Sequence, residues 1–200
     1  MEAEVVRDAT LHVAGQLDPL MYGPDLDPAV GLTLGRRSIY FRTSKEKKMT
    51  FLSTFDSPNP VECYQRAESI SPQQSLAMSN SPLTLTQSRN IAARLSQQLA
   101  DRSKEDSADS KENVASDFVR LAFLRVLNRE PHAAEVMECS SFLQQQTSRF
   151  ESAQPLTAFP GSTTAAATDS IVKPSADAAQ RARENLIHVL LNHNDFVTVR

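Results

Sequence analysis

Helical periodicity interrupted by proline and glycine is the feature that most constrains how this chain can fold. Val5, Ala9, Val13 and Leu17 recur every four residues, which predicts a helix over residues 2–17. Further helices are predicted over 45–54, 71–101, 113–128, 132–147 and 176–192, with 71–101 forming two helices in series. No strand pattern alternates with these helices, so a parallel sheet is not expected. The sequence therefore predicts a mainly α fold, organised as a single irregular helical domain over residues 1–200.

The segments between the predicted helices differ in composition. Proline and glycine punctuate residues 18–35, which predicts a loop. Residues 37–42 and 196–199 are predicted to be short strand-like or extended pieces. Residues 102–112 are almost entirely polar, which predicts a solvated linker. Residues 150–175 are rich in Ser, Thr, Ala and Pro and have few large apolar side chains, which predicts a disordered insertion.

The distribution of charge argues against a nucleic-acid partner. The formal net charge is −3, so no overall positive field attracts a polyanion. Basic residues surround Tyr40 and Phe41, a combination that can bind phosphate backbones. These cations are Arg36, Arg37, Arg42, Lys45, Lys47 and Lys48. No nucleic-acid-binding motif accompanies them, so they are predicted to form an exposed basic face beside a short strand.

The sequence contains no pattern typical of a cofactor, metal or catalytic site. Its five glycines form no dinucleotide-binding or phosphate-binding loop. Cys63 and Cys139 lie far apart and make no C-x-x-C pair, which excludes a zinc ribbon and a haem-attachment motif. They are either free thiols or one disulfide. The four histidines are scattered in a way that does not suit one metal ion. We therefore expect no cofactor, no metal and no catalytic residue.

Polar residues with directional side chains are dense around residues 62–80. Ser71, Pro72 and Gln74 form a capping-box pattern that predicts a helix start. Asn80 is predicted to end that helix in the left-handed conformation. Arg66 lies three residues after Cys63, and a nearby cation can lower the pKa of a thiol. Together with one arginine of the basic face, these residues make a candidate structural or binding cluster: Arg37, Cys63, Arg66, Ser71, Gln74 and Asn80.

Several strings, in order along the chain, resemble one known family. They are Glu4–Asp8, Arg36–Tyr40, Phe51–Asp56, Glu62–Ser81, Leu127–Pro131 and Val189–Phe196. They resemble the C-terminal domain of unknown function, family 1553, of planctomycete-type proteins that often also carry a cytochrome-c-like domain. The resemblance implies relatives that are exported and whose haem motif lies in another domain, and it supplies no activity. This chain departs from the family at His132, where Ser or Thr would complete a capping box with Glu135.

The amino terminus carries no targeting signal that can be recognised. Residues 1–8 lack the basic head and apolar core of a signal peptide. No apolar run approaches the ~20 residues of a membrane span. As written, the chain is expected to be cytoplasmic, although the proteins it resembles look exported. It is expected to be a C-terminal fragment of such a protein.

Two functions from different classes are compatible with these features. The first is a non-catalytic interaction or scaffold module of a larger multidomain protein, with other domains of that protein or a second copy as partner. The alternative is part of an extracytoplasmic redox or polysaccharide-related enzyme, with Arg37, Cys63 and Arg66 lining a cleft. Polar residues bound in caps and turns would favour the first, because buried polar groups are usually structural. Polar residues converging in a deep pocket would favour the second.

Overall fold

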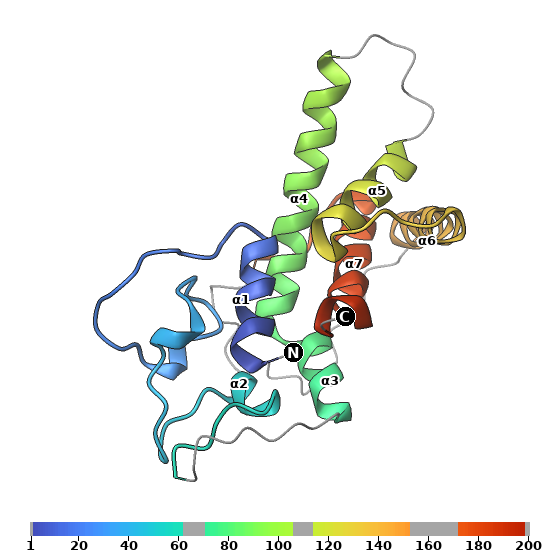
Figure 1. Cartoon of the computed structure of the whole chain (residues 1–200). Helices are drawn as coiled ribbons and strands as arrows, with labels where there is room; N and C mark the ends of the chain where they lie inside the picture. Colours follow the sequence, from blue (N-terminus) through green and yellow to red (C-terminus); the bar gives the residue numbers. More distant parts are fainter. Residues whose placement is uncertain (1, 62–70, 106–113, 153–171, 199–200) are drawn as a thin grey trace. The chain divides into compact units, whose positions relative to one another are not determined.

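The computed structural model of the chain describes residues 2–61, 71–105, 114–152 and 172–198 (Figure 1). These residues are mainly helical, which confirms the predicted fold class. They group into two compact units, one made of residues 1–87 with 191–200 and the other of residues 88–190.

The first unit combines short helices with a long irregular segment. Its elements are α1 (Ala3–Val13), the 3-10 turns η1 (Pro28–Val30) and η2 (Ser38–Tyr40), α2 (Thr50–Thr54), α3 (Pro72–Asn80), the first turns of α4 (Pro82–Glu105) and α8 (Asn194–Val197). Leu11 of α1, Leu52 of α2 and Met78 of α3 are all buried. The rings of Phe51 and Phe55 lie 5.1 Å apart within this core. The irregular segment runs from the end of α1 to the start of α2. Because α1 contacts both α2 and η2, this segment leaves the core at α1 and returns to it.

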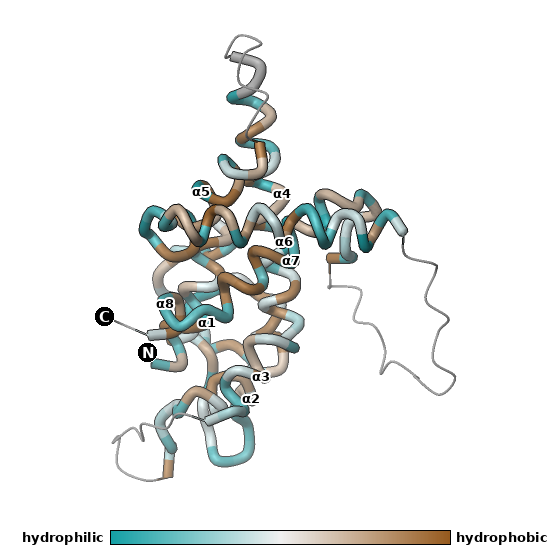
Figure 2. The backbone as a smooth tube through the Cα atoms, turned by 90° about the vertical axis from the view of Figure 1, so that its right-hand side faces the viewer, coloured by the Kyte–Doolittle hydropathy of each residue, from teal (hydrophilic) through white to brown (hydrophobic). Residues whose placement is uncertain are grey.

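The second unit contains the rest of α4 and the helices α5 (Val114–Leu127), α6 (Ala133–Ser152) and α7 (Ala178–Leu191). Leu191, the last residue of α7, belongs to the first unit. Polar and apolar residues are mixed along each of these helices, so each can bury one side (Figure 2). The unit's fully buried side chains include Ile91, Phe118, Val119 and Ile187. Helices α5 and α6 pack against one another.

The turn between α5 and α6 is held by Arg129. Its guanidinium donates two hydrogen bonds to the Glu135 carboxylate, at 2.8 and 2.7 Å, and lies 5.2 Å from the centre of the Phe123 ring. The same carboxylate accepts a hydrogen bond from the His132 backbone N–H at 2.7 Å, the half of the capping box that the sequence keeps. The bonds from Arg129 are the main cause that lowers the pKa of Glu135 to about 2.

Both predicted extended pieces are wrong over most of their described residues, although the backbones of Phe41 and Thr198 are extended. Residues 37–42 contain the turn η2, flanked by the isolated bridges Asp18–Arg36 and Leu26–Phe41. A strand needs a neighbour along several residues, and single bridges do not supply one. At the other position, residues 194–197 form α8. The His193 ring caps this helix by accepting a hydrogen bond from the Asp195 N–H at 3.1 Å.

The predicted linker 102–112 and insertion 150–175 lie largely outside the described residues. Helices extend into the start of each, because α4 continues to Glu105 and α6 to Ser152, whereas the described residues 172–175 are not helical. In the part of the chain that the structure covers, no helix has the length and apolar character needed to span a bilayer.

Candidate functional site

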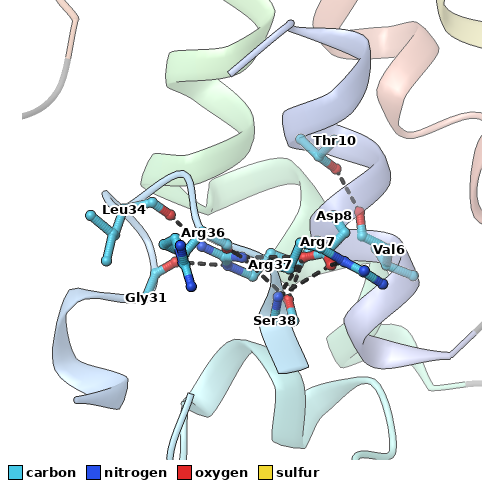
Figure 3. A network of polar contacts seen from close by, with 9 residues as sticks. All are labelled: Val6, Arg7, Asp8, Thr10, Gly31, Leu34, Arg36, Arg37 and Ser38. Atoms are coloured by element: carbon cyan, nitrogen blue, oxygen red, sulfur yellow. Dashed lines mark hydrogen bonds and ion pairs between the residues drawn. The ribbon is translucent and has the colours of Figure 1, made fainter. Parts of the chain in front are cut away.

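A buried arginine on α1 organises the irregular segment of the first unit. Arg7 is fully buried, and a buried cation needs hydrogen-bond partners on every donor it can offer. Its Nε donates to the Gly31 carbonyl at 2.8 Å, Nη1 to the Arg36 carbonyl at 2.8 Å and Nη2 to the Leu34 carbonyl at 2.5 Å (Figure 3). One side chain therefore satisfies three backbone acceptors of a segment that has no sheet or helix to satisfy them.

The next residue, Asp8, fixes the start of η2. Its carboxylate accepts hydrogen bonds from the Ser38 backbone N–H at 2.9 Å and from the Ser38 hydroxyl at 2.6 Å. The carboxylate also lies 3.3 Å from Nη1 of Arg7, so the two charges partly compensate. Burial lowers the pKa of Arg7, and Asp8 opposes this shift. Figure 3 shows the two side chains converging with Ser38 beside α1.

The Arg7 guanidinium is closed to solvent. The Phe41 ring lies 4.8 Å from the guanidinium carbon of Arg7 and covers it. Thr10, one turn along α1, is also fully buried and donates its hydroxyl to the Val6 carbonyl at 2.8 Å. Since no substrate can reach a fully buried guanidinium, we assign this network to shape and not to catalysis.

Arg36 makes a second clamp nearer the surface. Its Nη2 donates to the Tyr22 carbonyl at 2.6 Å, and its guanidinium stacks over Tyr40 at 4.4 Å. The Tyr40 hydroxyl accepts a hydrogen bond from the Tyr22 backbone N–H at 2.9 Å. Arg36 also approaches Asp18 at 3.6 Å, where the Asp18 N–H donates to the Gly35 carbonyl at 2.8 Å. Both backbone polar groups of Tyr22 are thus held.

The clamp presents three apolar side chains to solvent. Leu20 and Met21 are each 65% exposed and Tyr22 is 81% exposed. Tyr22 has φ = 65°, a left-handed conformation that is uncommon for a residue other than glycine. We call residues 20–22 the apolar tip.

The predicted polar cluster is only partly described, and its members have separate roles. Arg37 is half exposed and lies 3.9 Å from Asp8 at the edge of the Arg7 network. Cys63 and Arg66 lie outside the described residues. Cys139, the other cysteine, is a free thiol, and partial burial raises its pKa. No described contact joins Arg37 to the remaining members at 71–80.

The predicted capping box at 71–74 is wrong in its side-chain contacts. Ser71 occupies the N-cap position of α3, but its side chain makes no capping hydrogen bond. The Gln74 N–H donates to the Ser71 carbonyl at 3.1 Å, and the Gln74 side chain donates to the Asp56 carboxylate at 3.3 Å. Asn80 is the last residue of α3 and is not among the residues with positive φ, so the predicted left-handed ending is also wrong. The helix instead stops before extended Ser81 and restarts at Pro82.

A sequence pattern around Arg7 could have predicted its burial, but the apolar periodicity of α1 indicates a different buried face. The stripe from which α1 was predicted is not the face that the helix buries, because Val5 is 44% exposed. The fully buried residues are Ala3, Val6, Arg7, Thr10, Leu11 and Ala14, and among them Ala3, Arg7, Thr10 and Ala14 follow one another at helical spacing. Small residues one turn on either side of an arginine are the pattern that could have identified it.

Comparison with known proteins gives one match. A family model described as PSD1, protein of unknown function (DUF1553), matches residues 1–143. No curated protein and no solved structure matches the chain.

Proposed function

The chain belongs to the DUF1553 family of proteins of unknown function, and from that premise we propose that it is a non-catalytic interaction module. In this proposal the apolar tip docks on another protein. One observation carries it: the Tyr22 backbone is held at both its N–H and its carbonyl while the side chain is 81% exposed.

Ordering the tip has a cost that the described part of the first unit does not offset. A left-handed backbone at a residue other than glycine costs ~1 kcal/mol. The exposed side chains of Leu20 and Met21 gain no free energy of burial there. A partner that covered the tip would bury all three side chains, and tyrosine is among the residues that most often anchor protein interfaces.

The two arginine networks support this role by fixing the shape of the segment before binding. Preorganisation improves affinity because less conformational entropy is lost when the partner arrives. Arg7 fixes the backbone of residues 31–36, and Arg36 in turn holds Tyr22. The contacts therefore form a continuous route from the buried face of α1 to the exposed tip.

The partner that we propose is a neighbouring protein domain or a second copy of the chain. The family resemblance makes a cytochrome-c-like domain of the same larger protein the first candidate. The alternative function, a wall of an enzyme active site, rests on Arg37, Cys63 and Arg66 and stays a prediction.

The test replaces the apolar tip without touching the network beneath it. Leu20→Ser and Met21→Ser together should change the free energy of unfolding by less than ~0.5 kcal/mol per site, as is usual for exposed residues. The same double variant should lose self-association in sedimentation velocity, or lose binding to a purified cytochrome-c-like domain of a family member. Leu76→Ser is the matched control, because Leu76 is an exposed leucine of α3 in the same unit.

Two results would contradict the proposal. One is a double variant that associates as strongly as the native chain. The other is a native chain that stays monomeric and does not bind the cytochrome-c-like domain.

A further inference from the structure

A cavity in the second unit is lined by residues of α5, α6 and α7. Its volume is about 610 Å³, inside the ~300–1,000 Å³ range of small-molecule sites. Helix α6 contributes Ser140, Gln144, Thr147 and Ser148, which lie at helical spacing along one side. Helix α7 contributes Arg183. A row of hydroxyl and amide groups therefore faces the same space as a guanidinium.

Arg183 is the cation among the described lining residues, and its charge is incompletely compensated. Its Nη1 donates to the Ser96 hydroxyl at 2.9 Å, and its guanidinium carbon lies 5.1 Å from the centre of the Phe118 ring. Burial lowers the pKa of Arg183, and the Asp177 carboxylate opposes that shift. No carboxylate of the described residues forms an ion pair with it. A guanidinium offers five donors, and a partly buried one gains most from an oxyanion.

Ser140 gives a second, independent observation on the cavity wall. Its hydroxyl oxygen is buried and finds no hydrogen-bond partner in the described part of the chain. Buried polar atoms nearly always have a partner, so an unpaired one calls for an explanation. Rotation of the Ser140 side chain about its Cα–Cβ bond would bring this hydroxyl to the cavity surface, where a hydroxyl group of a bound ligand would supply the missing hydrogen bond.

We propose that this cavity binds a small organic monoanion, a carboxylate that also carries hydroxyl groups. The carboxylate would pair with Arg183, and the ligand hydroxyls would bond to Ser140, Gln144 and Thr147. A single arginine suits one carboxylate, whereas phosphate groups are typically recognised by clusters of arginines. The site is independent of the apolar tip, because every residue that lines it belongs to the second unit.

The test compares two probes that differ in one group. D-Gluconate carries a carboxylate and a chain of hydroxyls, and D-sorbitol has a neutral alcohol in place of that carboxylate. Amide chemical shifts of the isotope-labelled chain are followed during titration at constant ionic strength. Gluconate should cause saturable shifts in α6 and α7 near the lining residues, and sorbitol should not. No saturable response to gluconate, or an equal response to sorbitol, would overturn the proposal.

Variants then locate the charge that gluconate recognises. Arg183→Gln should weaken gluconate binding ~10-fold or more, the effect of losing one charge-assisted hydrogen-bonded pair. Arg181→Gln is the matched control: it lies on the same helix, stacks on Phe150 and does not line the cavity. If Arg183→Gln does not fold, Ser140→Ala takes its place, with weaker gluconate binding expected. Native affinity in the variant that folds would refute the proposed site.

Discussion

At the scale of the residue, Arg7 does for an irregular segment what a neighbouring strand does in a sheet. Three carbonyls within residues 31–36 receive their hydrogen bonds from one guanidinium. Sequence reasoning did not find this role, because arginine is seldom fully buried and is normally expected in solvent. The chemistry of the residue alone does not show where its acceptors lie, since they are far away along the chain.

Replacing Arg7 tests this role directly. Arg7→Met keeps most of the volume but leaves three carbonyls without their donor and the Asp8 carboxylate without the adjacent positive charge. We expect the free energy of unfolding to fall by about 3–5 kcal/mol, as when one partner of a buried ion pair is removed. Arg7→Lys keeps the charge but not the planar fork, so it should recover only part of the loss. Chemical denaturation measures both; equal stability of Arg7→Met and the native chain would contradict the assignment.

Gly35 is required for a different reason, the close approach of two backbone segments. A Cβ added at Gly35 would collide with the Gln16 carbonyl oxygen, which belongs to the backbone and has little room to move. Gly35→Ala should therefore lower stability by ~1–3 kcal/mol, the usual cost of overpacking. Thr33→Ala, at an exposed position of the same segment, should change it little. A melting temperature of Gly35→Ala equal to that of Thr33→Ala would show that the segment can separate without cost.

At the scale of the element, apolar periodicity predicted most helices, and proline marked the starts of α3 and α4. Local sequence patterns did not predict the side-chain contacts correctly. The capping box at 71–74 failed because the Gln74 side chain is bound by Asp56, a partner 18 residues away. The strand at 37–42 failed because its hydrogen bonds go to single residues of an irregular segment, such as Leu26. Ser71, Gln74 and Asn80 were therefore assigned to the right helix but with the wrong local contacts or conformation.

The turn between α5 and α6 gives a pH-dependent test of one such contact. The pKa of Glu135 is about 2 in the folded chain, below its ordinary value of 4.5. A lowered carboxyl pKa contributes stability that is present above pH 4.5 and is lost as the pH falls toward 2. Because the Glu135 side chain is partly exposed, Glu135→Gln should cost only ~1 kcal/mol at neutral pH, by urea denaturation.

The difference in the free energy of unfolding between the native chain and Glu135→Gln should become smaller as the pH is lowered from 4.5 toward 2. Glu138→Gln, an exposed glutamate on the same helix, is the control and should behave like the native chain at each pH. A stability difference for Glu135→Gln that does not change with pH would show that the ion pair is not its cause.

At the scale of the whole molecule, the two units compensate a buried positive charge in different ways. In the first unit the Arg7 guanidinium is bound by backbone carbonyls and by Asp8. In the second unit Arg183 has a hydroxyl and an aromatic ring, and it faces a cavity. The first arrangement suits a permanent structural bond, and the second leaves capacity for a ligand.

Hydrogen exchange tests whether the irregular segment is as well ordered as its bonds indicate. The amides of Asp18, Leu26 and Arg42 donate to backbone carbonyls at 2.8–2.9 Å although they lie outside any helix. We expect them to be protected from exchange in the native chain and to lose that protection together in Arg7→Met. Fast exchange of all three in the native chain would mean that the segment opens freely.

The sequence separation within the Arg7 network has a consequence for the order of folding. Apart from the neighbouring Asp8, the acceptors of Arg7 lie 24 to 31 residues away, so α1 formed by itself would turn toward an unfinished core a cation that lacks those bonds. Closing so long a loop is slow relative to forming a helix turn. The hydrogen bonds of Arg7 are therefore expected to form after the folding transition state. Loss of Arg7 should then speed the unfolding of the first unit more than it slows its refolding.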